Sequence, residues 1–178
     1  VVRSGRDRTG RDALAWADHG AAGSQSRPFG PGERLTFVLK WAFVPAGEAV
    51  LEVLPVDRMA GHEAHHFVLT ARSNGFVDAF FMVRDRIDAW ADSPMNRSLH
   101  YRKKQHEGRT RRDVTVLFDW DAMTAQYVNH GQAREPIAIT AGTFDPLSIF
   151  YWFRLVELSV GMQVRRPVTD GKKQVSGV

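Results

Sequence analysis

The sequence predicts a mainly all-β domain: an antiparallel, strongly curved sheet or incomplete β-barrel with one buried α-helix. Three observations predict this class. Apolar and polar residues alternate in many short segments, turn-forming residues separate these segments, and only residues 146–158 form a longer apolar segment without alternation. Many short strands with regular turns are typical of an antiparallel sheet or barrel.

Length and composition are consistent with such a domain. The chain has 178 residues, of which 43% are hydrophobic and 25% charged, as is usual for about one globular domain. A net charge of +4 is too small to indicate nucleic acid as a partner. No apolar run approaches the roughly 18 residues of a membrane-spanning helix, so we predict a protein that does not span the membrane. The lack of Cys excludes disulfides, thiolate zinc sites and a Cys nucleophile.

The chain divides near residue 28. Residues 1–27 are rich in Arg, Gly, Ser, Asp and Ala without a sustained period, which predicts a flexible tail or linker. Residues 28–178 are predicted to form a single β-rich domain, truncated at its C-terminus. Because the chain begins with Val rather than Met, we expect a processed product or a piece of a longer protein.

The first strand and hairpin give the clearest local pattern. Alternate positions are apolar at Leu35, Phe37, Leu39, Trp41 and Phe43, which predicts a strand with one buried face. Residues 45–47, Pro-Ala-Gly, are expected to break this strand and form a short turn. The alternation in 48–53 then predicts the second strand of an antiparallel hairpin.

Further strands follow at regular intervals. They are predicted at about 64–72, 85–92, 97–106, 110–120, 124–129, 135–140 and 162–169. Residues 76–83 fit either a helical turn or a strand. Asp170-Gly171 is typical of a hairpin turn, and residues 172–178 are predicted to begin the second strand of that hairpin. Since an open sheet edge is normally covered or paired, we expect more strands to follow in the natural protein.

One segment is predicted to be helical. Asp145 can cap a helix, and Pro146 suits the first helical position. The segment 147–158 is apolar nearly all round before Gly161 ends it. This pattern predicts a helix buried inside the curve of the sheet.

A zinc motif is present in the sequence. His62-Glu63-Ala64-His65-His66 matches H-E-x-x-H, in which two His one helical turn apart bind zinc and the Glu activates a bound water. On a strand, His62 and His66 would lie roughly 13 Å apart, too far to share one ion. Periodicity supports both a helix and a strand here. A zinc-dependent hydrolase using His62, Glu63 and His66 is therefore the alternative function, and a solvated strand entrance is the simpler interpretation.

Other chemical signals are weak. Residues 102–112 form a dense basic run, which favours a charged hairpin tip over polyanion binding because stacking aromatics are absent. The chain contains no phosphate-binding loop, nucleophile elbow or dinucleotide fingerprint. We therefore predict no cofactor and do not favour an enzyme.

Aromatic residues are the remaining feature. They could line an apolar cavity between sheet and helix, or they could fill it as a core. The candidate ligand-lining residues are Phe37, Trp41, Phe43, Trp120, Phe150 and Trp152.

These segments also resemble a known family. The matching positions are residues 28–37, Trp41, 45–49, 83–87, 107–109, 118–119, 144–148, Tyr151, Arg154 and 170–172. In this order they resemble the bacterial exported proteins of domain-of-unknown-function family 3108, DUF3108. The resemblance implies an envelope-exported, mainly β protein without established activity, a strand rather than a helix at residues 62–66, and further C-terminal strands. For Asp145, Pro146, Ser148 and Arg154 it implies helix capping and packing.

Together, these observations predict a non-enzymatic periplasmic or cell-envelope protein. We expect its curved sheet to bind a lipid, another apolar ligand or an envelope protein partner.

Overall fold

A computed structural model describes residues 27–177, in which the predicted fold class is confirmed. The described part is mostly β, with small helices and a sheet that does not close into a barrel. The strands and helices, in chain order, are β1 (Arg34–Trp41), β2 (Val44–Met59), β3 (His62–Ser73), α1 (Gly75–Asp78), β4 (Arg84–Asp92), β5 (Ser98–Glu107), β6 (Thr110–Asp119), β7 (Thr124–Asn129), β8 (Gln132–Ala133), β9 (Ile137–Ala138), α2 (Ser148–Phe153), β10 (Arg166–Thr169) and β11 (Gln174–Gly177). The predicted tail lies outside the described residues except for Arg27.

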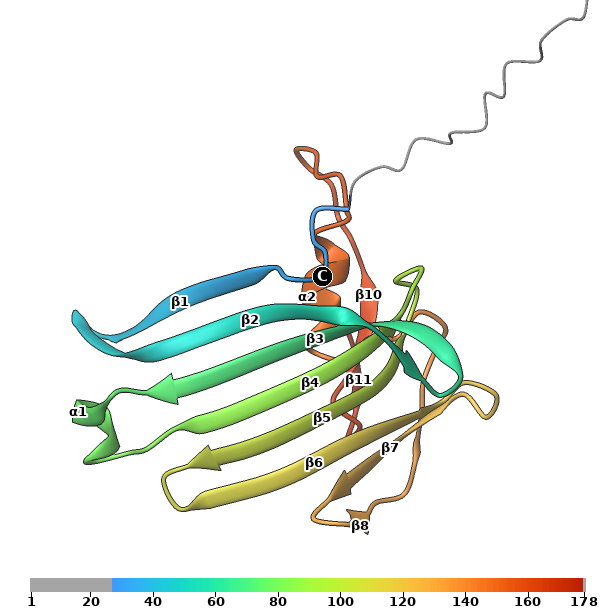
Figure 1. Ribbon diagram of the computed structural model, residues 1–178. Coiled ribbons are helices and arrows are strands. Elements are labelled where there is room, and N and C mark those ends of the chain that lie inside the picture. The colour runs from blue at the N-terminus through green and yellow to red at the C-terminus, as the bar shows by residue number, and fades with distance from the viewer. Residues whose placement is uncertain (1–26, 178) are drawn as a thin grey trace, which may run out of the picture.

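Spatial order in the main sheet follows chain order. The strands run β1-β2-β3-β4-β5-β6-β7-β8, each antiparallel to the next, and β9 also pairs with β7. Strands β10 and β11 form a separate hairpin, as the Asp170-Gly171 signal predicted. Figure 1 shows α2, β10 and β11 on one side of this broad sheet. Within residues 27–177, no helix combines the length and apolar character needed to cross a bilayer.

The core lies on one face of the sheet, which we call the inner face. Alternate residues of successive strands point to it because side chains in a strand alternate between faces. They pack against Phe144, Leu147 and Tyr151. The buried contributors from the sheet are Leu51, Val53, Phe67, Ala89, Ala91, Tyr101, Val114, Val116, Ala125 and Tyr127.

The first hairpin differs from its prediction in two respects. Its turn is Ala42-Phe43, with Ala42 in the left-handed region at φ 53°, whereas Pro45-Ala46-Gly47 belongs to β2. These residues lie at a register shift opposite Leu39 and Lys40, where a bulge accommodates a proline without an N–H. The predicted buried face of β1 is also wrong beyond Leu35, because this end of the hairpin extends past α2 and its side chains stay exposed.

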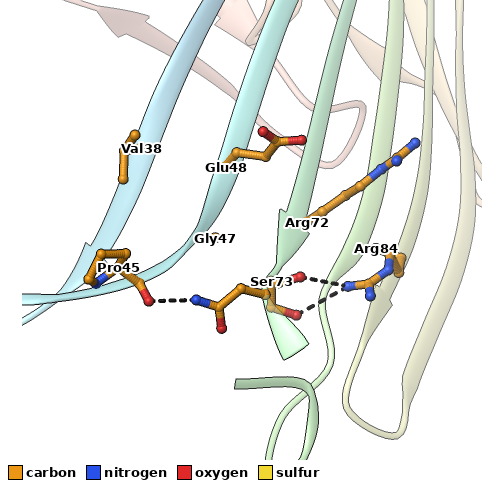
Figure 2. A pocket seen from close by; sticks show the side chains of 8 residues that line it. Val38, Pro45, Gly47, Glu48, Arg72, Ser73 and Arg84 are labelled. Carbon is orange, nitrogen blue, oxygen red and sulfur yellow. Dashed lines mark hydrogen bonds between the residues drawn. The ribbon is translucent and has the colours of Figure 1, made fainter. Parts of the chain in front are cut away.

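Gly47 is required by the close approach of β2 to β3 (Figure 2). A Cβ at this position would overlap the Arg72 carbonyl oxygen and lie 2.9 Å from Ser73 Cα, so backbone would have to move. We expect Gly47→Ala to lower the free energy of unfolding by about 1–3 kcal/mol in urea denaturation. Gly30→Ala is the control, because a Cβ there meets nothing within 4 Å and should change stability by no more than about 0.5 kcal/mol. Equal losses in both variants would contradict the close-approach argument.

The predicted helix at 146–158 is shorter in the structure. Helix α2 covers only Ser148–Phe153, and turns follow it. Ser148 and Tyr151 are buried, while Phe150 and Phe153 are exposed, so one face packs on the sheet rather than the whole circumference. Residues 154–156 stay half-buried in the turns that follow, and residues 157–163 are exposed.

Smaller differences also have local causes. Of the two structures predicted for residues 76–83, the helical turn is the one present. Helix α1 begins after Asn74, whose side chain accepts a hydrogen bond from the Val77 N–H. The strand predicted at 135–140 is reduced to β9, because Pro136 interrupts pairing directly before it. The strand predicted at 162–169 begins only at Arg166.

Candidate functional site

One half of the inner face is filled by the protein itself. The Tyr151 ring stacks on Phe67 with centroids 3.9 Å apart, and the Phe29 ring meets both edge-on at 5.3 and 5.6 Å. Arg154 holds the Phe29 segment in place, since it donates to Glu33 at 2.5 and 2.9 Å and to the Pro28 carbonyl at 2.5 Å. In this half the aromatic residues form a filled core and not a cavity.

The other half of the inner face carries apolar side chains that nothing in residues 27–177 covers completely. We call Leu35, Phe37, Leu39, Leu69 and Ile87 the apolar strip. Cross-strand pairing places them on the inner face: Leu35 and Leu69 both lie opposite buried Leu51, and Ile87 lies opposite Leu69. Leu35, Leu69 and Ile87 pack against the core, but Phe37 is 46% exposed and Leu39 40%. The strip therefore continues the core into solvent.

Cationic side chains occupy a position further across the same face. We call Lys103, Arg112 and Lys172 the cationic cluster. They line a small cavity of about 40 Å³ together with Asp170 and three core residues, Tyr101, Val114 and Tyr127. The Lys172 ammonium lies 4.8 Å from the centre of the Tyr127 ring, within cation–π distance. The lining of this cavity carries three cations and one carboxylate, and the Asp85 carboxyl on β4 also interacts with Lys103.

Two acceptors on this face lack hydrogen-bond partners. Gln105 Oε1 and Asn129 Oδ1 are buried without a partner among the described residues. Gln105 is two positions beyond Lys103 on β5, and Asn129 two beyond Tyr127 on β7, so both share the inner face. An unpaired buried acceptor costs about 1–3 kcal/mol.

Asp85 lies on the same face of β4, two positions before Ile87. Its burial raises the pKa of the carboxyl above the usual value, and the neighbouring Glu107 acts in the same direction. The His106 backbone N–H donates to it at 2.9 Å and partly opposes this shift. The uncovered half of the inner face is therefore amphipathic, with an apolar side and a polar, charged side.

The six candidate ligand-lining aromatics lie in three places. Phe37 is in the apolar strip, and Trp41 and Phe43 are at the β1–β2 turn. Trp120 follows β6, where its Nε1 donates to the Ser98 carbonyl at 2.9 Å. The remaining two, Phe150 and Trp152, are on α2. The structure brings only Phe37 to the uncovered half of the inner face.

The zinc hypothesis required a helix at residues 62–66, and the structure does not have one there. These residues begin strand β3, as the family resemblance implied. His62 is exposed, whereas the His66 ring packs on Trp90 at 4.2 Å and its Nε2 lies 3.0 Å from Asp88 Oδ1. The two imidazoles are thus not one helical turn apart, and the hydrolase alternative loses its geometric basis. Across residues 27–177, no three His, Asp or Glu side chains lie together as metal ligands would.

Sequence reasoning missed the cationic cluster. The basic run 102–112 does form the predicted β5–β6 hairpin, and Arg102 pairs with Asp113 at 3.3 Å. Lys103, however, lies two positions after Tyr101 on β5, so its side chain points to the same inner face. This two-residue spacing is the sequence signal that could have placed Lys103 there. Lys172 gave no such signal, because only the packing of the β10–β11 connection brings it to Tyr127.

Fold and site together define an open antiparallel β protein whose inner face is filled over one half only. The chain belongs to the family described as Protein of unknown function (DUF3108), whose model matches residues 36–178. The resemblance found in the sequence is thereby confirmed. No curated protein and no solved structure matches the chain.

Proposed function

We propose that this chain is a non-enzymatic cell-envelope protein that binds an amphipathic lipid on the uncovered half of its inner face. The acyl chain would lie along the apolar strip, and the anionic head group would meet the cationic cluster. The observation that carries this proposal is the continuation of the core into exposed Phe37 and Leu39 on the face that also carries Lys103. Resemblance to exported proteins is the support for an envelope location.

The amphipathic character favours a lipid over a purely apolar molecule. A hydrocarbon would gain from the strip, at about 25 cal/mol per Å² of apolar surface buried, but would leave the cations without an anionic partner. A fatty acid places its alkyl chain on the apolar strip and its carboxylate against the cations. Native mass spectrometry of the gently purified protein tests occupancy directly, and a lipid-sized adduct is the expected result.

Head-group recognition predicts a charge-dependent affinity. We expect Lys103→Gln and Lys172→Gln each to weaken binding of the fluorescent fatty acid cis-parinaric acid by about tenfold, the usual loss for a charge-assisted hydrogen bond. Lys173→Gln is the matched control, since this exposed neighbour does not line the cavity. The methyl ester of the probe, which lacks the charge, should bind wild type and Lys103→Gln equally.

Two results would count against this function. Fluorescence that never saturates with wild type would exclude a defined fatty-acid site. Saturable binding that is unchanged by Lys103→Gln, Lys172→Gln and Phe37→Ser would place the ligand elsewhere. A co-purified protein instead of a lipid would favour the interaction role.

A further inference from the structure

The connections at one end of the main sheet expose an unusual set of aromatic side chains. The β1–β2 turn, the α1 segment between β3 and β4, and the β5–β6 turn meet at this end (Figure 1). We call these connections together with the last residue of β1, that is residues 41–43, 74–83 and 108–109, the aromatic end. Its aromatic residues are all more than half exposed: Trp41 75%, Phe43 95%, Phe76 65%, Phe80 80% and Phe81 51%.

Hydrogen bonds join the three connections to one another. The Asn74 side-chain amide donates to the Pro45 carbonyl at 2.6 Å, and its backbone N–H donates to Ala46 O at 2.8 Å. The Gly108 N–H donates to Met82 O at 2.8 Å, and Phe81 packs on Gly108, where a Cβ would be 2.7 Å from its ring. The exposed aromatics are therefore presented by a connected platform and not by independent loops.

Charge is distributed unequally between the two ends of the sheet. With two flanking residues on each side, the three connections of the aromatic end contain five cations and three carboxylates: Lys40, Arg72, Arg84, Arg109 and Arg111 against Asp78, Asp85 and Glu107. The three connections at the opposite end, counted in the same way, contain two cations and four carboxylates: Arg58 and Arg97 against Glu63, Asp92, Asp119 and Asp121. The sheet connections are thus net positive at the aromatic end and net negative at the opposite end.

Several of these cations are available to an external anion. Arg84 forms an ion pair with Asp78, in which Arg84 Nη2 lies 2.5 Å from Asp78 Oδ2. Lys40, Arg72, Arg109 and Arg111 have no carboxylate of residues 27–177 within 4 Å. Arg72 also lines a surface depression of about 450 Å³ between β2 and β4, in which Figure 2 shows its side chain extending away from Pro45 and Ser73.

We propose that the aromatic end docks onto the surface of an anionic lipid bilayer, with Trp41, Phe43 and Phe80 at the head-group level and the unpaired cations against lipid phosphates. Protruding aromatic rings with neighbouring Lys and Arg suit this interface, because the rings bury apolar surface while the cations remain hydrated and meet negative charge. The described connections at the opposite end carry more carboxylates than cations and no comparable group of exposed aromatic residues, so the aromatic end is the one that would face the bilayer. Docking stands independently of lipid binding on the inner face.

Vesicle flotation tests the proposal with the 178-residue chain. We expect binding to phosphatidylcholine vesicles that contain phosphatidylglycerol, and little binding to phosphatidylcholine alone. Trp41→Ser/Phe43→Ser should weaken binding about tenfold or more. Arg109→Gln/Arg111→Gln should weaken it about fivefold for each charge, and added salt should do the same to wild type. These side chains are exposed, so circular dichroism should be unchanged.

Matched substitutions away from the aromatic end serve as controls. Phe153→Ser on α2 and Arg165→Gln/Lys173→Gln remove exposed side chains of the same kinds and should leave flotation unchanged. Absence of flotation, equal flotation on both lipid compositions, or equal losses in control and test variants would overturn the proposal. It would also be overturned by a wild-type dimer in gel filtration that Trp41→Ser/Phe43→Ser converts to monomer, because a second copy would then occupy this surface.

Discussion

Tyr151→Ala is expected to lower the free energy of unfolding by about 3–5 kcal/mol, the usual loss for a buried aromatic residue. Tyr151 is fully buried and stacks on Phe67, which also meets Phe29. Its removal opens a cavity where the N-terminal segment, the sheet and α2 meet. Chemical denaturation followed by circular dichroism measures the effect.

The matched control is Tyr151→Phe. The Tyr151 hydroxyl is buried without a hydrogen-bond partner in the described part of the chain, and burial raises its pKa to about 12, so it stays neutral in ordinary buffers. Removing an unpaired hydroxyl keeps the ring packing and removes a desolvation cost. We therefore expect Tyr151→Phe to be neutral or slightly stabilising. A large loss in this variant would mean that the hydroxyl has a partner and that ring packing is not the main contribution.

Asp145→Ala is expected to cost about 2–4 kcal/mol, because it leaves several buried groups unpaired. The carboxylate accepts from the Leu147 and Ser148 N–H groups at 2.8 and 2.9 Å and from Ser98 Oγ at 2.5 Å. Asp145→Asn should cost much less. Its amide oxygen can keep both backbone donors, and its NH₂ can donate to Ser98 Oγ.

The Asp145→Asn variant also isolates a pH effect. Complete burial raises the pKa of Asp145 above its ordinary value of 3.8, and the hydrogen bonds that favour the ionised form only partly oppose this. The native state then binds the proton more tightly than the unfolded state. The stability this provides is fully present below the ordinary pKa and is lost as pH rises through the native pKa.

Urea denaturation of wild type and Asp145→Asn over a pH series measures this effect. From about pH 4 towards neutrality, wild type should lose stability relative to the Asn variant, since the other carboxylates contribute equally to both proteins. A difference that is constant with pH, or that changes in the opposite direction, would show that the buried carboxylate is not proton-stabilised.

The strands were predictable because their signal is local. In β1, Leu35, Phe37 and Leu39 occupy alternate positions, and this period requires no knowledge of the neighbouring strands. The turn at Ala42-Phe43 gives no comparable signal. Pro45 and Gly47 are typical of turns, but the same residues also serve bulges, and only pairing with β1 and β3 distinguishes the two.

Local periodicity does not indicate whether a face of the sheet is covered by other parts of the chain. Leu35 and Phe37 follow the same alternation, yet Leu35 packs against the core and Phe37 remains 46% exposed, because α2 covers only part of the inner face. The candidate site depends on such tertiary placement. Lys103 and Lys172 belong to different hairpins, and neither local pattern nor spacing indicates that they line one cavity.

The strand order also bears on how the chain reaches this fold. Because every strand from β2 to β8 pairs with its predecessor in sequence, the sheet can assemble by successive hairpin closures, each with a small loop-entropy cost. The contact of Arg154 with Glu33 spans 121 positions and fastens α2 to the segment that carries Phe29. Closing a loop of this length costs more entropy than closing a hairpin, so we expect this contact to form after the sheet has assembled.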